Sequence, residues 1–135
     1  MLQVLSRFYS SLVHSSRYIP RRAIMYVPGD DTRKVRKASH LECDCIALDC
    51  EDGVAMNRKQ LARESIRAFF DSGANIPPDD CLDKRRKTEW AVRINAVDSG
   101  LCEEDIKVLV SGIKPPETIL LPKCESAEDL KYVGC

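Results

Sequence analysis

Three carboxylates stand close together directly after a short apolar run in the first half of this chain. The run is Cys-Ile-Ala-Leu at positions 45–48, and Asp49, Glu51 and Asp52 follow it, with Gly53 behind them. Such a run is typical of a strand buried on both faces, and α/β proteins bind ligands at the carboxyl ends of these strands. Acids placed there could hold a metal ion, position a water molecule or orient a basic partner. The alternative is a strand-to-helix loop whose acids only cap the next helix.

The elements that would position these acids alternate along the chain from residue 23 onward. Strand-like runs occupy residues 23–27, 45–48, 90–95 and 118–121; amphipathic helical patterns occupy 33–39, 57–70 and 103–110, and another helix opens at Ser126. Four strand–helix units in sequence predict a parallel α/β architecture. A (β/α)8 (TIM) barrel takes about 250 residues, so the chain would supply roughly its N-terminal half. An open four-stranded sheet with helices on both faces is the alternative.

Half a barrel would leave two strand edges open and an apolar inner face without its opposite wall. Such a face favours aggregation unless another chain covers it. Within the predicted helix 57–70, Leu61, Ile66 and Phe70 supply apolar positions, and Lys59 and Arg63 are among the charged residues between them. This mixture is the pattern of an amphipathic helix.

The overall composition excludes two classes of partner. The chain has 21 Lys and Arg against 21 Asp and Glu, so it carries no bulk basic field that would bring it to nucleic acid. It also contains no uninterrupted apolar run of the roughly 18 residues that a membrane span needs. We therefore expect neither a nucleic-acid partner nor a membrane partner.

Seven cysteines are scattered through strand-like runs and helix ends. The odd number and the scatter predict reduced thiols in a reducing compartment, without a disulfide framework. His40, Cys43, Cys45 and Cys50 could be read as a zinc cluster, but they lack the usual Cys-x-x-Cys spacing, and alternate residues of a strand face opposite ways. We interpret these cysteines as packing residues.

Residues 1–22 form a separate N-terminal segment. They contain no acid, carry Arg7, Arg17, Arg21 and Arg22, and place apolar residues at roughly helical spacing. These features predict a mitochondrial presequence and hence a matrix location, with a disordered basic arm as the alternative. The fold would then comprise residues 23–135. Residues 77–87, with two prolines and four consecutive basic residues, are expected to form a solvated loop.

Four short motifs occur in order at the predicted strand ends. They are Met-Tyr-Val-Pro-Gly at 25–29, Leu-Asp-Cys-Glu-Asp-Gly-Val at 48–54, Val-Arg-Ile-Asn at 92–95 and Leu-Pro-Lys-Cys-Glu-Ser at 121–126. Together they strongly resemble the citrate lyase beta-subunit-like family of the HpcH/HpaI aldolase superfamily. Among its members, the mitochondrial enzymes that cleave citramalyl-CoA are the most similar. The likeness extends from Tyr18 to Tyr132, except for the loop at 77–87, which looks like an insertion.

The resemblance implies a TIM barrel that cleaves citramalyl-CoA to acetyl-CoA and pyruvate with Mg²⁺, in mitochondria, as a homo-oligomer. Its substrates would be an acyl-CoA thioester and a small keto acid. In such a carbon–carbon lyase, a metal and an arginine bind the keto-acid portion and stabilise its developing oxyanion.

By the same resemblance, Arg93 at the end of the third strand would hold the substrate carboxylate and carbonyl oxygen, a bidentate task that suits a planar guanidinium. Tyr26, taken to lie at the tip of the first strand, would contact the acyl-CoA together with Arg33 and Lys37; the family usually has lysine where Arg33 stands. Asp49, Glu51 and Asp52 would support Arg93 and a metal-bound water in catalysis. The structural alternatives are an exposed helix face for Arg33 and Lys37, core packing for Tyr26 and a structural ion pair for Arg93.

The resemblance further implies that the family's metal ligands, and a catalytic aspartate supplied by a neighbouring subunit, lie beyond Cys135. One hypothesis is therefore a truncated lyase that is inactive alone. The other is a noncatalytic chain that binds acyl-CoA or pairs with a full-length subunit through its open strand edges. A product too short to be stable is the third possibility.

Overall fold

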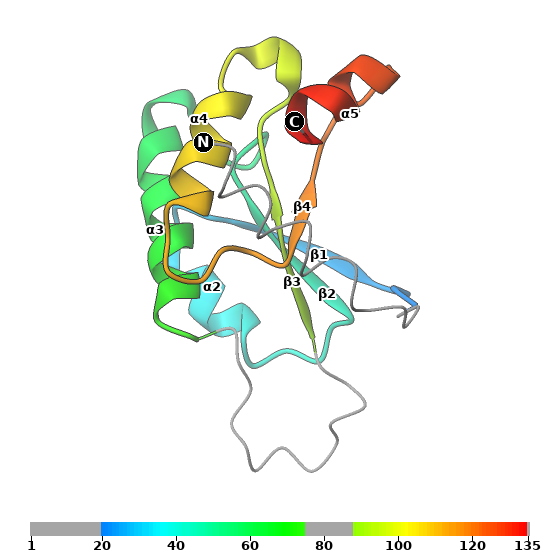
Figure 1. The fold of residues 1–135 in the computed structure, drawn as a ribbon. Coiled ribbons are helices and arrows are strands. Elements are labelled where there is room, and N and C mark those ends of the chain that lie inside the picture. The colour runs from blue at the N-terminus through cyan, green and yellow to red at the C-terminus, as the bar shows by residue number, and fades with distance from the viewer. Residues whose placement is uncertain (1–19, 75–87, 135) are drawn as a thin grey trace.

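Four parallel strands form one sheet in the order β1-β2-β3-β4. The structure, a computed structural model, describes residues 20–74 and 88–134. The strands are β1 (Ile24–Pro28), β2 (Cys45–Asp49), β3 (Glu89–Arg93) and β4 (Thr118–Leu120). Each strand pairs with the next one along the chain, so the sheet has no reversal of strand order within the described residues (Figure 1).

A helix follows every strand. These helices are α2 (Thr32–Ala38), α3 (Lys59–Asp71), α4 (Cys102–Val110) and α5 (Ala127–Gly134), with short 3-10 turns η1 (Met56–Arg58) and η2 (Val97–Ser99) before α3 and α4. The four predicted strand–helix units are therefore confirmed. The predicted helix 57–70 differs in its first turn, which is the 3-10 turn η1, and α3 begins at Lys59.

Side chains at the helix starts set two of these boundaries. The Asp31 carboxylate accepts the backbone N–H groups of Arg33 and Lys34, each at 3.1 Å, and so caps α2. At α5, Ser126 Oγ accepts the N–H of Asp129 at 3.3 Å, and Asp129 Oδ2 accepts the N–H of Ser126 at 2.9 Å. This reciprocal pair is a capping box, at the helix start that the sequence predicts at Ser126.

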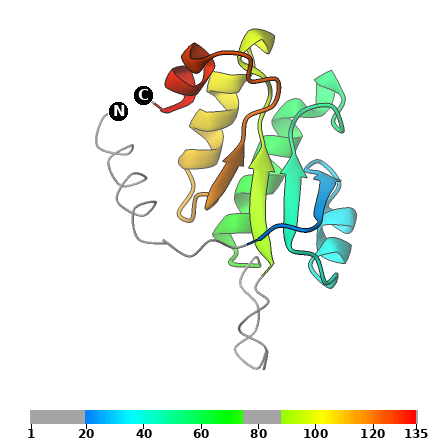
Figure 2. The same ribbon diagram turned by 90° about the vertical axis from the view of Figure 1, so that its right-hand side faces the viewer.

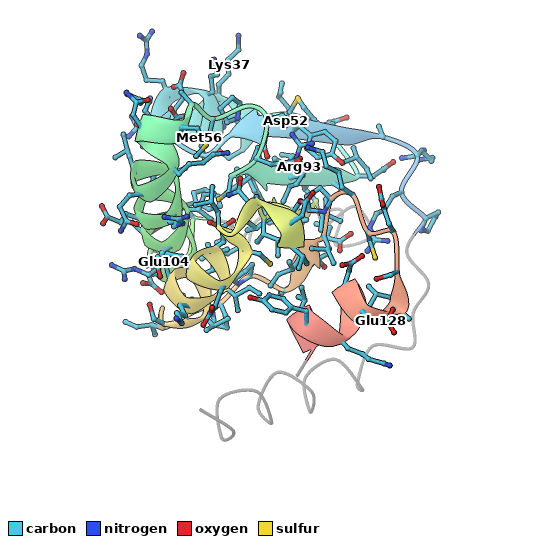
Figure 3. All side chains as sticks on the ribbon, turned by 90° about the horizontal axis from the view of Figure 1, so that it is seen from above. Lys37, Asp52, Met56, Arg93, Glu104 and Glu128 are labelled. Atoms are coloured by element: carbon cyan, nitrogen blue, oxygen red, sulfur yellow. The ribbon has the colours of Figure 1, made fainter. Side chains whose placement is uncertain are left out.

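The two faces of the sheet have different neighbours. Ile46, Leu48 and Val92 point to one face, where they pack with Ile66 and Phe70 of α3 in the main core. Alternate residues Cys45, Ala47 and Ala91 form a small cluster on the other face with Leu120, and no helix contributes to it. Figure 2 shows α3 and α4 behind the sheet, and Figure 3 shows α3, α4 and α5 following one another around the outside of the strands.

Sequential parallel strands with their helices on one face are the arrangement of a (β/α)8 barrel segment. The alternative of an open sheet with helices on both faces is therefore wrong. Large apolar residues such as Ile46, Leu48 and Val92 face the helices, whereas the buried residues on the opposite, inner face are the small Cys45, Ala47 and Ala91, so only one face is suited to helix packing.

Two ion pairs join the start of the described chain to the sheet. Arg22 pairs with Asp44 at 2.7 Å, and Arg21 pairs with Glu89. The hydrogen bonds from Arg22 lower the pKa of Asp44 to about 2. Residues 1–19 of the predicted presequence and the predicted loop at 77–87 lie outside the described residues.

The cysteines within the described ranges are free thiols. Cys45 belongs to the inner-face cluster, whereas Cys50 and Cys102 belong to the main core, so Cys45 and Cys50 lie on opposite faces of the sheet. Burial raises the pKa of the Cys50 and Cys102 thiols. No helix among the described residues is long and apolar enough to cross a membrane.

Candidate active site

The candidate site lies where β2 and β3 end side by side. The parallel register places Asp49 of β2 opposite Arg93 of β3. Seen from above, Arg93 and Asp52 lie near each other over the strand ends, with Lys37 farther out on α2 (Figure 3). The acidic motif and the arginine predicted from the sequence are thus brought together.

Asp49 holds the Arg93 guanidinium in a two-point ion pair. Arg93 Nε donates to Asp49 Oδ1 at 2.8 Å, and Arg93 Nη2 donates to Asp49 Oδ2 at 2.7 Å. The same two oxygens accept the backbone N–H groups of Glu51 and Gly53, each at 2.8 Å. With four donors on a carboxylate that is 1% exposed, Asp49 is an orienting group for Arg93 with little capacity left for a ligand.

The charges of this pair reinforce each other. Burial alone would raise the pKa of Asp49, but hydrogen bonds from Arg93 and from the two backbone N–H groups outweigh it, and the net pKa is lowered. The hydrogen bonds to Asp49 in turn raise the pKa of Arg93, although burial opposes this. Both groups are therefore charged at neutral pH.

Two glycines make room for this arrangement. A Cβ on Gly53 would lie 2.6 Å from Asp49 Oδ2, and a Cβ on Gly29 would lie 2.4 Å from the Ile66 side chain. The Gly53 backbone can approach the Asp49 carboxylate closely only because this residue has no side chain. The glycine of the 48–54 motif is therefore part of the geometry that holds Arg93.

Glu51 is also buried, at 5% exposure, and it lies between two cations. Its Oε2 is 3.0 Å from Arg93 Nη1, and its Oε1 is 2.9 Å from Lys123 Nζ. Neither oxygen has a hydrogen bond of good geometry, so ion pairing alone engages this carboxylate. Asp52 lies at the exposed rim, 3.9 Å from Arg93 and 3.8 Å from Lys123.

Lys123 is a member of the site that the sequence did not predict. It follows β4 with φ 49°, a left-handed conformation that is uncommon for a residue other than glycine. Ion pairing with Glu51 and Asp52 raises the pKa of Lys123. Its place in the Leu-Pro-Lys motif at a strand end was the only signal, because this contact depends on the turn conformation.

Tyr26 lies beneath the guanidinium. The Arg93 Cζ atom is 4.6 Å from the centroid of the Tyr26 ring, a cation–π distance. Tyr26 is 50% exposed, so its interpretation as a core-packing residue is wrong. Its predicted position at the tip of the strand is also wrong: it is the third residue of β1, where strand alternation points it to the inner face beside Ala47.

Arg33 and Lys37 lie on α2, outside this ion-pair cluster. Arg33 lines an open cavity of about 420 Å³ between the start of α2 and the loop after β2. Lys34 and Arg58 contribute two further cations to it; Arg58 pairs with Asp30, and Lys34 lies 3.4 Å from Asp31. Lys37 is exposed one helical turn beyond Arg33 and does not line the cavity.

The acids of the site do not form a ligand set for Mg²⁺. Both Asp49 oxygens are occupied by hydrogen bonds, and each Glu51 oxygen faces a cation at 2.9–3.0 Å. The described residues contain no group of three or more His, Cys, Asp or Glu side chains arranged to hold a metal. The carboxylates of this site instead pair with the side chains of Arg93 and Lys123.

Comparison with known proteins identifies the family of this chain. The HpcH/HpaI aldolase/citrate lyase family model matches residues 22–134. The chain is 44% identical over 124 residues to the mitochondrial citramalyl-CoA lyase of Homo sapiens, covering 92% of this chain and 33% of that protein.

Two solved structures from Mycobacterium tuberculosis share the fold. One is a citrate lyase beta subunit complexed with oxaloacetate and magnesium, with a TM-score of 0.59 and 30% identity over 82% of this chain and 42% of the other. The second is protein CitE in complex with magnesium, acetoacetate and coenzyme A, with a TM-score of 0.58 and 31% identity over 82% of this chain and 35% of the other.

The chain spans about a third of the length of the curated relatives that it matches. Within this chain, the residues that the family model matches include every described strand and helix. The chain belongs to the HpcH/HpaI aldolase/citrate lyase family.

Proposed function

We propose that this chain carries the arginine half of the active site of a carbon–carbon lyase that cleaves citramalyl-CoA to acetyl-CoA and pyruvate. The observation that carries the proposal is Arg93, held at a strand end by Asp49 and stacked on Tyr26. The family's curated members include citramalyl-CoA lyase and citrate lyase subunit beta, which supports a lyase acting on a CoA ester.

The cleavage needs charge stabilisation that Arg93 can supply. The substrate hydroxyl gives its proton to a general base and the carbon–carbon bond breaks. The electron pair of that bond passes to the methylene carbon beside the thioester carbonyl, and the resulting enolate takes up a proton to give acetyl-CoA. The oxygen of the former hydroxyl becomes the pyruvate carbonyl. A guanidinium already oriented by Asp49 stabilises the negative charge on this oxygen and on the neighbouring carboxylate without reorganising during the reaction.

Asp49, Glu51, Asp52 and Lys123 would serve as positioning groups. Asp49 engages Nε and Nη2 of Arg93, and Glu51 lies near Nη1, so a ligand carboxylate would bind the remaining N–H groups of the two terminal nitrogens. Glu51 and Asp52 also hold Lys123 at the rim, where it adds a second cation. Tyr26, half exposed on the inner face, would form one wall of the keto-acid site.

The cavity beside α2 is the proposed contact region for the phosphates of the CoA group. Its three cations, Arg33, Lys34 and Arg58, suit phosphate oxygens, and the Arg33 side chain has no ion-pair partner within the described residues. Lys37, exposed on the same helix, would add attraction at longer range. The solved relative with coenzyme A bound supports an acyl-CoA ligand for this family.

Three further properties belong to the same proposal. The family structures that contain magnesium support a magnesium-dependent reaction, but the described residues do not fit this ion, so its ligands would be other residues. The mitochondrial relatives and the Arg-rich N-terminal segment support location in the mitochondrial matrix. We further propose that the protein works as a homo-oligomer.

The test measures binding and turnover in the same samples. Citramalyl-CoA is titrated into the purified chain with Mg²⁺ by calorimetry, and pyruvate release is followed with a coupled dehydrogenase. Arg93→Lys should weaken binding about 10- to 100-fold, as expected for loss of a charge-assisted bidentate contact. Arg36→Lys, an exposed residue of α2, is the matched control and should leave binding unchanged. Binding insensitive to Arg93→Lys, or no binding by the folded chain, contradicts the proposal.

The same experiment separates a second candidate, a noncatalytic acyl-CoA-binding or subunit-pairing chain. This candidate is favoured by the edges of β1 and β4, which pair with no further strand within the described residues. Binding that depends on Arg93 without pyruvate release would favour it, whereas pyruvate release that is lost in Arg93→Lys would favour the lyase.

A further inference from the structure

A chain of buried polar side chains lies beneath the Arg93 site and has no part in the function proposed above. Its members are Lys59 and Arg63 of α3, Asn95 after β3 and Asp105 of α4, and each is at most 7% exposed. Asp105 Oδ1 accepts Arg63 Nε at 2.6 Å, and Asp105 Oδ2 accepts the Asn95 backbone N–H at 2.6 Å and its side-chain Nδ2 at 2.7 Å.

Lys59 connects this chain of contacts to the loop that carries Glu51. Its ammonium donates to the carbonyl oxygens of Cys50 and Glu51, each at 2.7 Å, and to Asn95 Oδ1 at 2.8 Å. An ammonium has three N–H groups, so all of its donors are used inside the protein. Two of the three fix the backbone directly after Asp49, and the third fixes a residue two positions after Arg93.

This placement matters because Lys59 adds a charged contact to the Glu51 carbonyl oxygen, which among the described residues otherwise accepts only the Val54 backbone N–H, at 3.1 Å. The Glu51 carboxylate makes ion pairs but no good hydrogen bond, so its position depends on its backbone. That backbone is held from one side by the bond of its N–H to Asp49 and from the other by the bond from Lys59 to its carbonyl oxygen. A shift of this residue would move the carboxylate away from Arg93 Nη1.

Stability alone is a weak reason for such a network. Burying an ammonium, a guanidinium and a carboxylate carries a large desolvation cost, and apolar side chains of similar volume often serve a core equally well. What apolar residues cannot do is fix two carbonyl oxygens and a neighbouring loop at hydrogen-bond distance.

We propose that Lys59 is a positioning residue of the active site: it holds the loops after β2 and β3 together and thereby sets the orientation of the Arg93 guanidinium. The role of Arg93 toward a ligand rests on the proposed function, but the effect of Lys59 on Arg93 does not.

The test is a nitrogen-15 NMR measurement of the Arg93 side chain in the full chain, with its Nε–H signal assigned from the spectrum of Arg93→Lys. Lys59→Met keeps the length and volume of the side chain and removes the ammonium. We expect it to shift the Arg93 Nε–H signal and to speed its exchange with water about tenfold, because the three hydrogen bonds that hold the neighbouring loops are lost. Leu109→Ala, in the main core on α4, provides a stability-matched control and should leave this signal in place.

Two outcomes would overturn the proposal. One is an Arg93 signal that Lys59→Met leaves unchanged; the other is an Arg93 signal that Lys59→Met and Leu109→Ala disturb equally, because the network would then act only through stability. If Lys59→Met does not fold, Asn95→Leu removes one of the three Lys59 acceptors and should give a smaller change in the same direction. Failure of both variants to fold would assign the network to the core and also overturn the proposal.

A pyruvate titration of the same samples keeps the two proposals apart. Absence of pyruvate binding to the wild-type chain counts against the proposed function only, since the Arg93 signal of the ligand-free chain still decides the role of Lys59. If pyruvate binds, Lys59→Met should weaken it about tenfold more than Leu109→Ala does.

Discussion

Replacing Asp49 by asparagine should destabilise the chain strongly, although the two side chains have nearly the same shape. Each Asp49 oxygen accepts one backbone N–H and one guanidinium N–H. Whichever way the new amide is oriented, its NH2 group faces two donors, so one backbone N–H and one Arg93 N–H lose their acceptor. This result does not depend on the catalytic role of the site.

The magnitude follows from the burial of these donors. A buried donor left without a partner costs about 1–3 kcal/mol. The backbone N–H cannot reach water easily, whereas Arg93, 20% exposed, can turn part of its guanidinium to solvent. We therefore expect Asp49→Asn to lower the free energy of unfolding by about 2–4 kcal/mol, a large part of the total stability of a small domain.

Urea unfolding provides the assay. Trp90 is the only tryptophan of the chain and is 7% exposed. The centroids of the Trp90 and Phe69 rings are 4.7 Å apart, so the fluorescence of Trp90 reports on the core. Asp52→Asn is the matched control, because it makes the same chemical change at a side chain that is 68% exposed and 3.9 Å from Arg93. Its effect should stay below about 0.5 kcal/mol. Equal and small losses in the two variants would refute the view that Asp49 is the anchor of Arg93.

Three other predictions follow from the same geometry. Because hydrogen bonds lower the pKa of folded Asp49, the stabilisation from its charge is complete above the unfolded pKa of about 3.9 and is lost as the pH falls through the lower folded pKa. The difference in urea midpoint between wild type and Asp49→Asn should therefore be constant near neutral pH and shrink below about pH 4. A constant difference down to pH 2 would contradict this. Gly53→Ala should lower the free energy of unfolding by about 1–3 kcal/mol, since the new Cβ would lie 2.6 Å from Asp49 Oδ2. Gly100→Ala measures backbone strain alone, because φ is 71° there and a Cβ meets no atom within 4 Å. Arg33→Ala should weaken CoA binding about 5- to 10-fold by calorimetry while Arg36→Ala does not, and equal effects would show that only the net charge of α2 matters.

Periodicity was sufficient to predict the strands and helices, because each element has a clear pattern, but it left open whether helices cover one face of the sheet or both. The continuous apolar run at 45–48 and the helical spacing in 57–70 are typical of a strand buried on both faces and an amphipathic helix, and both form. The meeting of Asp49 and Arg93 was also predictable in outline, because neighbouring parallel strands end at one edge of the sheet.

Other features of the site could not be found in this way. Lys59 and Arg63 have the spacing of a charged, solvated helix face, yet both are buried, because Asp105 and Asn95 from distant parts of the chain receive them. Leu61, counted among the apolar positions of the predicted helix, is instead 44% exposed, because it lies on the side of α3 that faces away from the sheet. The contact of Lys123 with Glu51 depends on a left-handed turn that no periodic pattern indicates.

The most direct test of the central claim is a pyruvate titration followed by the nitrogen-15 side-chain signals of arginine. If Arg93, fixed by Asp49 and Tyr26, receives the keto-acid carboxylate, its Nε–H signal should move with a saturable dependence on pyruvate, and the signals of exposed arginines such as Arg36 should not. The response should be absent in Arg93→Lys. A folded chain in which pyruvate leaves the Arg93 signal unmoved, or moves all arginine signals alike, would contradict the account.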